Sequence, residues 1–544
     1  MKNKIGKKPL IVLAVLLASV LLSAGILAII ALTNLAATGN VLGVDWYNQK
    51  DKEFVITTKQ ELKEFAALSS YYDFKDQTIK LGADIVVNEG NAEEWQETAP
   101  KTKWTGIKGF AGTFDGQGHT ISGLYASGYN STIGLFTGVK TSALIKDTKL
   151  TNSYLESRGF GGVSSFATGG GGNYEKLYSD AKINVIGAYS GYAGGICSKM
   201  NAITNIDECW YEGVITTTGR ITGGILDDIN GSTATVSHSL FSGTINSTYD
   251  HSGAIAGGLV GKSTTEGASL VIQDCLSAGT ITTGHSDTTG SVFGGAASGT
   301  SFRSINSYGV DTLQGIGVGG VNGAVYLLPM QVKPENMIGF EAYKWMDLDF
   351  EKYWCVVEDG TPRLQYFSDE IPSVAGIERE FDTSWYTEGG ANNVIMNTKQ
   401  LRGFYLLSGR TNFENTTIKL GADIVVNEGN AKDWKTTAPA EEWYQIDGFA
   451  GTFDGQGHSI SGLYMNNDAR YNGFFKTTRN ATVKNFLLKN TMIINMLGTD
   501  LSTGSISGNA SGTFENIDVP PTLVSFAVTT GKTAKRALEA IGYY

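Results

Sequence analysis

The sequence predicts an all-β fold, a parallel β-helix in which short strands stack coil upon coil. Three observations carry this prediction. A glycine-rich strand–turn–strand stretch occurs twice, at residues 109–125 and 448–464. Paired glycines followed by an aliphatic strand recur from residue 194 onward, at intervals of 29, 34 and 37 residues. Glycine supplies 70 of the 544 residues, well above its average share of about 7%, which suits a chain with many sharp corners.

The chain contains a long internal duplication. Residues 46–125 align without a gap with residues 385–464, at a constant offset of 339, and more than half of the aligned positions are identical. The segment TIKLGADIVVNEGNA is the same in both copies. Because the chain exceeds the length of one typical domain, we expect a first β-helix module at residues 46–367, a linker at 368–384, and a second, shorter or truncated module at 385–544.

The N-terminal region predicts export. Four lysines in the first eight residues precede an uncharged apolar run that begins at Leu10 and ends at Leu32. A helix of this length, at about 1.5 Å per residue, spans the roughly 30 Å of a membrane core. We expect a basic cytoplasmic tail at residues 1–9, a signal anchor or long signal peptide at 10–33, and a linker at 34–45. Whether the anchor is cleaved stays open, so the remaining chain is expected at the extracellular face of the membrane or secreted.

Charge argues against nucleic acid as a partner. The formal net charge is −11, and no cluster of Lys and Arg follows the first eight residues. A nucleic-acid-binding surface needs such a basic patch to neutralise phosphates. Hydrophobic residues make up 41% of the chain, enough to build a sizeable core.

The four cysteines do not predict a disulfide scaffold. Cys209 and Cys275 occupy matching places in the repeated units CWYEG and CLSAG, with Ser239 of SLFSG between them. Two coils separate them by about 9–10 Å, beyond the ~7 Å limit between the Cα atoms of a disulfide. We expect both at buried positions for small residues, and a bridge involving Cys197 or Cys355 stays open.

Each module is predicted to begin with a short helix. Thr58 and Glu61 form a capping box ahead of apolar residues at helical spacing. Asn397 and Gln400 fill the same roles in the second copy. We expect this helix to cover an open end of the coil, where unpaired strand edges would otherwise be exposed.

A turn motif in each copy holds the residues singled out as structural. They are Gly112, Asp115, Gly116, Gly118 and His119, and their counterparts Gly451, Asp454, Gly455, Gly457 and His458. The recurring Asp and His allow an acid/base pair or metal ligands as an alternative. We interpret them as turn residues, because they are embedded among glycines and have no third catalytic partner.

These motifs resemble those of a known family. The segments KLGADIVV and GFAGTFDGQGHTISGL, followed by GLFTG and GLVG, resemble the GLUG-motif proteins of bacterial cell surfaces. The stretch from Met346 through Trp354 to Leu364 resembles the closing segment of such repeats. The resemblance covers about residues 46–367 and the opening of the second copy. It implies a right-handed parallel β-helix at the cell surface.

An enzyme is the alternative, because parallel β-helices also carry polysaccharide lyases and glycoside hydrolases. Such enzymes need carboxylates on one face, with a proton-abstracting base or Ca²⁺. The candidate residues are Asp207, Glu208, Asp227, Asp228, Asp274, Lys199, Arg220 and Arg303. None of them repeats in register, and we interpret them as parts of solvated loops.

No catalytic, metal-binding or cofactor-binding residue is assigned from the sequence. None of the five histidines has the His-Glu-x-x-His spacing, and no P-loop or GxSxG motif is present. Asp347 and Asp349 form a weak candidate for Ca²⁺. Three tyrosines in variable stretches, Tyr211, Tyr249 and Tyr308, could stack on sugars, but we expect core packing or chance exposure instead.

The sequence therefore favours a non-catalytic role. We expect an exported adhesin, binding or stalk module for a host, matrix or polysaccharide ligand. A lyase or hydrolase acting on a polysaccharide is the alternative.

Overall fold

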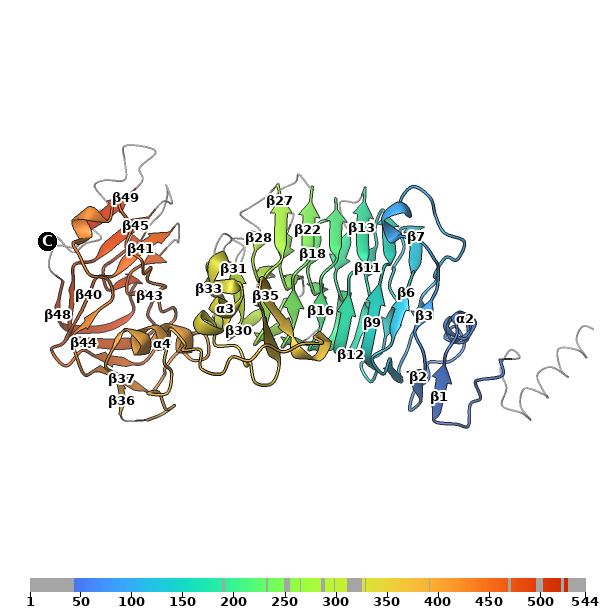
Figure 1. Ribbon diagram of the computed structural model, residues 1–544, viewed down its shortest axis with the longest axis horizontal. Coiled ribbons are helices and arrows are strands. Elements are labelled where there is room, and N and C mark those ends of the chain that lie inside the picture. The colour runs from blue at the N-terminus through green and yellow to red at the C-terminus, as the bar shows by residue number, and fades with distance from the viewer. Residues whose placement is uncertain are drawn as a thin grey trace, which may run out of the picture.

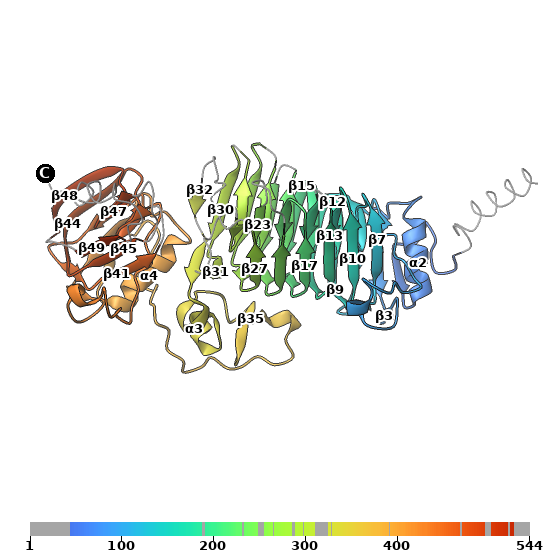
Figure 2. The same ribbon diagram turned by 90° about the horizontal axis from the view of Figure 1, so that it is seen from above.

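The chain forms a parallel β-solenoid of about 12 coils with few helices (Figures 1 and 2). The computed structural model describes residues 44–187, 191–230, 233–248, 255–264, 266–284, 289–297, 299–310, 325–327, 329–390, 392–467, 471–495, 502–519 and 523–526. The strands fall into two sets, a first coil from β1 to β33 and a second coil from β36 to β49. The predicted all-β parallel architecture is confirmed.

Three parallel sheets build the first coil. The five-stranded sheet contains β11 (Gly162–Ser164), β14 (Tyr192–Gly194), β18 (Ile221–Gly223), β23 (Ile255–Gly257) and β28 (Thr289–Gly290). The six-stranded sheet contains β7 (Tyr125–Tyr129), β10 (Tyr154–Arg158), β13 (Lys182–Ile186), β17 (Val214–Thr217), β22 (Thr244–Ser247) and β27 (Thr280–Thr283). The long sheet contains β1 (Glu53–Ile56), β2 (Thr78–Leu81), β3 (Ile85–Val86), β4 (Ile107–Lys108), β5 (Thr113–Asp115), β6 (Thr120–Ser122), β8 (Phe136–Val139), β9 (Leu144–Thr151), β12 (Ala167–Ser179), β15 (Cys197–Asp207), β16 (Trp210–Tyr211), β19 (Leu226–Ile229), β20 (Thr233–Ser237), β21 (Leu240–Phe241), β24 (Val260–Ser263), β25 (Ser269–Gln273), β26 (Leu276–Ser277), β29 (Phe293–Ala296), β30 (Ser301–Ile305), β31 (Tyr308–Val310), β32 (Val325–Leu327) and β33 (Met330–Val332).

The second coil repeats this plan over fewer turns. Its largest sheet contains β36 (Asn393–Ile395), β37 (Thr417–Leu420), β38 (Ile424–Val425), β39 (Thr452–Asp454), β40 (Ser459–Ser461), β44 (Ala481–Lys489) and β48 (Gly512–Asp518). Its smaller sheets contain β41 (Tyr464–Asn467), β45 (Met492–Asn495) and β49 (Leu523–Phe526), then β42 (Tyr471–Asn472) with β46 (Ser502–Thr503), and β43 (Phe475–Thr477) with β47 (Ser507–Asn509). Each coil has its own apolar core.

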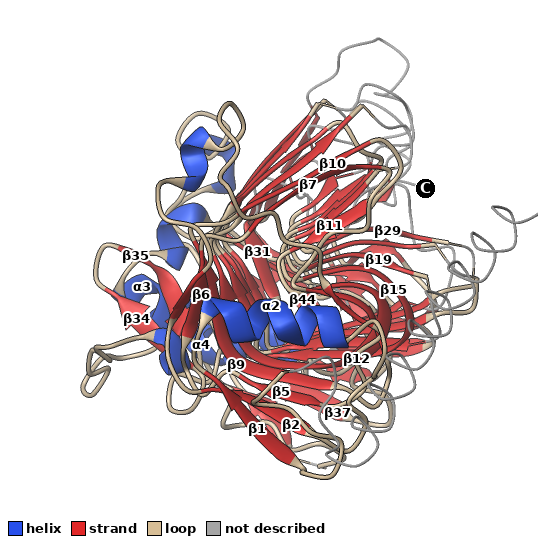
Figure 3. Ribbon diagram, turned by 90° about the vertical axis from the view of Figure 1, so that its right-hand side faces the viewer, coloured by secondary structure: helices blue, strands red, loops and turns tan. Residues whose placement is uncertain are grey.

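The predicted capping helices are present. Helix α2 (Lys59–Leu68) begins after Thr58, whose side chain accepts a hydrogen bond from the Glu61 amide while Glu61 reaches back to the cap backbone. Its Phe65 enters the first core, and the helix lies across the N-terminal end of the coil (Figure 3). Helix α4 (Thr398–Ser408) begins after Asn397 in the same way. The remaining helices are α3 (Phe340–Trp345) and the 3₁₀ turns η1 (Ala92–Glu94), η3 (Pro334–Met337), η4 (Gln365–Phe367) and η5 (Ala431–Asp433).

The repeated glycines form one row along the first coil. Gly194, Gly223 and Gly257 pair in register on successive strands of the five-stranded sheet, as the repeat predicts. The next member of the row is Gly290. The repeat predicts the fourth member at Gly294, which is wrong because Gly294 follows Phe293, the partner of Val260. The pairing of apolar core strands, and not the doublet of glycines, therefore sets the register.

A column of left-handed residues marks one corner of the first coil. On six successive turns of the first coil, a non-glycine residue at this corner has φ between 41° and 53°. These residues are Asp147, Lys176, Glu208, His238, Asp274 and Asn306. We call these six residues the corner column. The strand residues just before them pair in register, so the corner of each turn stacks directly on the corner of the preceding turn.

Residues 333–367, the lateral segment, run along the side of the first coil (Figure 2). They include α3 and the antiparallel hairpin of β34 (Trp354–Val357) and β35 (Gly360–Leu364). The hairpin packs on an outward apolar row formed by Trp210, Leu240, Leu276 and Tyr308. We expected this stretch to close the end of the first coil. It covers the flank of the coil instead, because the outward-facing apolar row must be shielded from solvent.

The cysteines are free and buried. The amide of Cys209 donates to Ser239 Oγ at 3.1 Å, and the amide of Cys275 donates to Ser307 Oγ at 3.2 Å. Cysteine and serine thus alternate on one ladder of successive coils, as predicted. The open possibility of a bridge through Cys197 or Cys355 is excluded.

Several expectations lie outside the described residues. The segments at 1–9 and 10–33 and nearly all of the linker at 34–45 belong to this group, as does the end of the second module after residue 526. Within the described ranges, none of the helices has the length and apolar character needed to cross a membrane.

Candidate functional site: an aromatic pocket between the two coils

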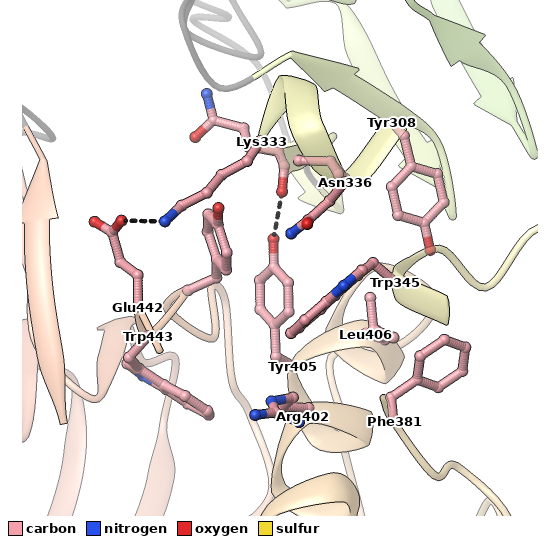
Figure 4. A pocket seen from close by; sticks show the side chains of 13 residues that line it. Tyr308, Lys333, Asn336, Trp345, Phe381, Arg402, Tyr405, Leu406, Glu442 and Trp443 are labelled. Atoms are coloured by element: carbon pink, nitrogen blue, oxygen red, sulfur yellow. Dashed lines mark hydrogen bonds and ion pairs between the residues drawn. The ribbon is translucent and has the colours of Figure 1, made fainter. Parts of the chain in front are cut away.

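A narrow pocket lies where the end of the first coil meets the start of the second (Figure 4). Its cavity is small, about 50 Å³, and opens to solvent. The first coil contributes Lys333, Asn336 and Trp345, which follow strand β33. The second coil contributes helix α4 and the loop at residues 442–444. The pocket exists because α4 has two apolar faces, one in the second core and one against the first coil.

Aromatic rings form most of its wall. Tyr405 and Tyr444 stack with ring centroids 5.5 Å apart and an interplanar angle of 24°. The guanidinium of Arg402 lies 5.1 Å from the ring of Trp345. These three rings are half-buried, so each keeps part of its surface toward solvent. Trp443 is buried and donates its indole N–H to the carbonyl of Phe474 at 3.2 Å.

Ion pairs hold the rim of the pocket. Lys333 Nζ lies 3.2 Å from Glu442 Oε2 and joins the two coils directly. Arg402 Nη2 lies 2.8 Å from Glu441 Oε2, and Arg402 Nη1 donates to the carbonyl of Glu380 at 3.0 Å. Half-buried pairs of this kind present fixed donors and acceptors beside the rings.

The internal duplication shows that the pocket residues are particular to the second copy. Tyr405, Tyr444 and Glu442 stand where the first copy has Ala66, Thr105 and Lys103, at the offset of 339. The neighbouring core residue is unchanged, since Trp443 matches Trp104. The second copy thus departs from the first where it faces the pocket and keeps the residue that packs inside. Sequence reasoning missed this site, although the same alignment contained the signal.

The turn-motif residues lie on the outer edge of the coil. In the first copy, Gln117 N donates to Asp115 Oδ1 at 3.0 Å, and the Cβ of any residue at Gly116 would lie 2.1 Å from Thr148 Oγ1. Gly118 has φ of +79°. His119 lies beside Asp84, with 3.2 Å between Nδ1 and Oδ1, and not beside Asp115.

The second copy repeats this arrangement. Asp454 accepts from the Gln456 amide at 3.0 Å, and His458 Nδ1 lies 3.6 Å from Asp423. The recurring Asp and His of the motif therefore have separate partners. The matching glycines are Gly112 and Gly451, which lie against backbone carbonyls of residues 74 and 413, and Gly455 and Gly457, which complete the turn.

The acidic candidates for catalysis divide into two groups. Asp207, Glu208 and Asp274 belong to the corner region. Asp207 Oδ1 lies 2.8 Å from His238 Nδ1, and the ring of Tyr353 stacks on His238 at 3.7 Å. Asp207 is therefore linked through the His238 ring to Tyr353 of the lateral segment. Asp227, Asp228, Lys199 and Arg220 come together elsewhere, whereas Arg303 is exposed on β30.

Other candidates have different surroundings from those expected. Asp347 is paired with Arg379 at 3.1 Å and with Arg410 at 2.7 Å, so its carboxylate holds guanidinium groups. In the described part of the chain, no group of three or more His, Cys, Asp or Glu residues has the geometry to hold a metal ion. Tyr211 and Tyr308 are fully buried, which agrees with the packing expected for them and removes the sugar-stacking alternative. Tyr249 lies outside the described residues.

Comparisons with known proteins provide no family. No protein-family model and no curated protein matches the chain. Among solved structures, the chain is similar to a "putative immunoglobulin A1 protease" from Bacteroides ovatus. The identity is 16%, the match covers 60% of this chain and 97% of that chain, and the TM-score is 0.41. A likeness at this level carries no statement about activity.

Proposed function

We propose that this chain is an exported cell-surface solenoid that binds an extracellular glycan in the pocket between its two coils, without cleaving it. The observation that carries the proposal is the exchange of Ala66 and Thr105 for Tyr405 and Tyr444 at the pocket wall. Aromatic faces pack against the apolar C–H faces of sugar rings, while a few fixed polar groups orient the hydroxyls. The pocket offers both.

The location and family follow from the sequence and are part of the proposal. The basic tail and the apolar run from Leu10 to Leu32 support export, with the run serving as membrane anchor if it is retained. The turn and GLVG motifs support a bacterial GLUG-type surface protein with a right-handed coil. The first coil then acts as a stalk that carries the pocket away from the membrane.

The test is a glycan array probed with the full-length protein in detergent, followed by titration of the best ligand. Tyr444→Thr and Tyr405→Ala install the residues of the first copy, and each is expected to weaken binding at least about tenfold. Tyr129→Ala removes an aromatic ring that is 76% exposed on the first coil and serves as the matched control. Equal binding by all three variants, or release of shortened glycan, would contradict the proposal.

A further inference from the structure

The corner column of the first coil has a counterpart on the second coil. Strands β39, β44 and β48 stack in register there, as β5, β9 and β12 do in the first coil. Strands β44 and β48 lie on the side of the second coil that is away from the first (Figure 1). Asn485 and Asn516 follow the paired residues, with φ of 53° and 50°. They therefore occupy the corner positions that Asp147 and Lys176 hold in the first coil.

In the first coil, the end of the lateral segment fills the groove beside this corner. The phenol of Tyr366 donates to Asp147 Oδ1 at 2.9 Å, and Lys176 Nζ lies 4.7 Å from the centre of the same ring. The next residue, Phe367, lies against Tyr178, with 5.9 Å between the two ring centroids. Two consecutive aromatic side chains thus anchor the segment on the corner.

The matching groove of the second coil is open. It has a volume of about 520 Å³, and the residues that line it include Asp454, Gly457, Asn485, Asn516 and Asp518. Among the described residues, the hydrogen bonds and ion pairs of this groove come from the turns of the second coil itself. The described part of the second coil therefore has no counterpart of the aromatic pair that fills the first groove.

The open groove offers an acceptor for a phenol. Asn485 Nδ2 donates to Asp454 Oδ1 at 3.0 Å, and Asn516 Nδ2 donates to Asn485 Oδ1 at 3.1 Å. Because a side-chain carbonyl oxygen has two lone pairs, Asn485 Oδ1 can accept a second hydrogen bond. This oxygen stands at the position where Asp147 accepts from Tyr366. A tyrosine can therefore bind the second groove as Tyr366 binds the first.

One position gives the second groove a different chemistry. Asp518 pairs in register with Leu487, as Tyr178 pairs with Lys149 in the first coil. It places an exposed carboxylate where the first coil has the ring that contacts Phe367. A carboxylate is stabilised by a neighbouring cation, whereas covering it with a benzene ring costs free energy. The second groove therefore favours a basic residue after the tyrosine.

We propose that this groove is a docking site for an extended segment of a partner protein, in which a tyrosine is followed by lysine or arginine. The tyrosine lies beside Asn485 and Asn516, and the basic residue pairs with Asp518. The first coil carries the model for this contact, because its own groove holds two consecutive side chains of an extended segment. The site is separate from the pocket at Tyr405 and goes beyond the glycan binding proposed for that pocket.

The experiment is a titration of full-length protein in detergent with a fluorescent peptide of residues 361–368 that carries Phe367→Lys. Adding Tyr366→Ala to the peptide is expected to weaken binding at least about fivefold, because the ring and the phenol are lost. Asp518→Asn in the protein is expected to weaken it several-fold, as is a higher salt concentration. Glu428→Gln removes another exposed carboxylate of the second coil and is expected to leave binding unchanged.

A change of preference provides the sharpest test. Asp518→Tyr installs the residue of the first coil, so the peptide with the native Phe367 is expected to bind this variant more tightly than the peptide with lysine. Equal binding of the two peptides by the unmodified protein, or an unchanged preference in Asp518→Tyr, would overturn the proposal.

Two glycine variants locate the peptide. Asn485→Gly keeps the left-handed backbone and removes the acceptor, so it is expected to weaken the binding of both peptides. Asp147→Gly makes the same change on the first coil and is expected not to weaken binding. Loss of binding in Asp147→Gly with full binding in Asn485→Gly would place the peptide on the first coil and overturn the proposal.

Discussion

The phenol of Tyr366 donates a hydrogen bond to the carboxylate of Asp147 at 2.9 Å, across 219 positions of sequence. The ammonium group of Lys176 lies 4.7 Å from the centre of the same ring. The C-terminal end of the lateral segment therefore contacts an early turn of the first coil, whereas its N-terminal part packs on the last turns. The corner column is the surface that it follows.

Removing this hydrogen bond is expected to loosen the end of the lateral segment. Tyr366→Phe keeps the ring and removes only the hydroxyl, so we expect a loss of about 1 kcal/mol in the free energy of unfolding. Urea denaturation measures this loss, and limited proteolysis is expected to cut residues 333–367 faster. Tyr71→Phe, at a tyrosine that is 68% exposed, is the control and should change neither. Unaltered proteolysis of Tyr366→Phe would show that other contacts suffice to hold the segment.

The glycine row is expected to tolerate no side chain. A Cβ at Gly223 would lie 2.0 Å from the carbonyl oxygen of Leu226, a backbone atom that cannot move aside. Gly223→Ala is expected to cost at least about 3 kcal/mol. Gly295→Ala places the same methyl group 4.0 Å from its nearest neighbours, two atoms of the Ile255 side chain, and is expected to cost less. Thermal melting of both variants measures the difference, and equal melting temperatures would refute the close approach.

The cysteines are expected to be inert in the folded protein. All four are free and buried, and burial raises the pKa of the Cys209 and Cys275 thiols. Because the thiolate is the reactive form, a disulfide reagent should modify no cysteine at pH 8 and all four after unfolding. Rapid labelling of the native protein would show that the buried cysteines become accessible to the reagent without global unfolding.

Stability is expected to fall as the pH rises through the range in which Asp228 ionises. The folded state raises the pKa of Asp228 from 3.8 to about 6, so the folded protein binds this proton more tightly than the unfolded chain. The stabilisation is complete below pH 3.8 and is lost by the time the pH exceeds about 6. At about 1.4 kcal/mol per pKa unit, the loss amounts to at most about 3 kcal/mol.

Asp228→Asn isolates this contribution. The difference in unfolding free energy between variant and wild type is expected to shift in favour of the variant between pH 4 and pH 8. Denaturant titrations at both values measure it. A difference that does not change with pH would show that Asp228 is ionised throughout.

The ion pair between Lys333 and Glu442 is expected to stabilise the contact between the coils modestly. The native pair has 3.2 Å between Lys333 Nζ and Glu442 Oε2. Lys333→Glu replaces it by two neighbouring negative charges at the pocket rim, and Glu442→Lys by two positive ones. Each is expected to cost up to about 1 kcal/mol, and the double exchange should restore most of the loss. A double-mutant cycle measures the coupling energy. A coupling near zero would leave the apolar contacts of α4 as the main attachment.

The sequence was sufficient to predict features that depend on local motifs and on neighbouring turns of the solenoid. The row from Gly194 to Gly257 and the helix cap at Thr58 follow from local chemistry that each repeat carries. The repeat failed at Gly294, because the glycine in register is Gly290, which is followed by Ser291, and the doublet at Gly294 imitated the expected one. Tyr211 and Tyr308 are buried for different reasons. Tyr211 lies in the first core, whereas Tyr308 faces outward and is covered by residues 333–367, a contact that no local pattern reveals.

The proposed pocket and the register of the strands depend on contacts that no local pattern reveals. Tyr405 and Lys333 meet only because the chain turns back after the lateral segment and brings α4 against the first coil. Lys199 and Lys262 share a row only because loops of different length separate strands that stay in register. The unequal repeat intervals concealed that register in the sequence, and the paired strands disclose it.

The lateral segment also changes how the first coil would respond to a pulling force. An array whose turns contact only their neighbours unravels one turn at a time from a loose end. In this chain the lateral segment is hydrogen-bonded to two distant turns of the first coil. Its Tyr366 contacts Asp147, and the backbone carbonyl of its Asp347 contacts Asn306. The turns between these two contacts therefore share an applied force. Under a pulling force, the first coil would therefore yield in one large step and not turn by turn.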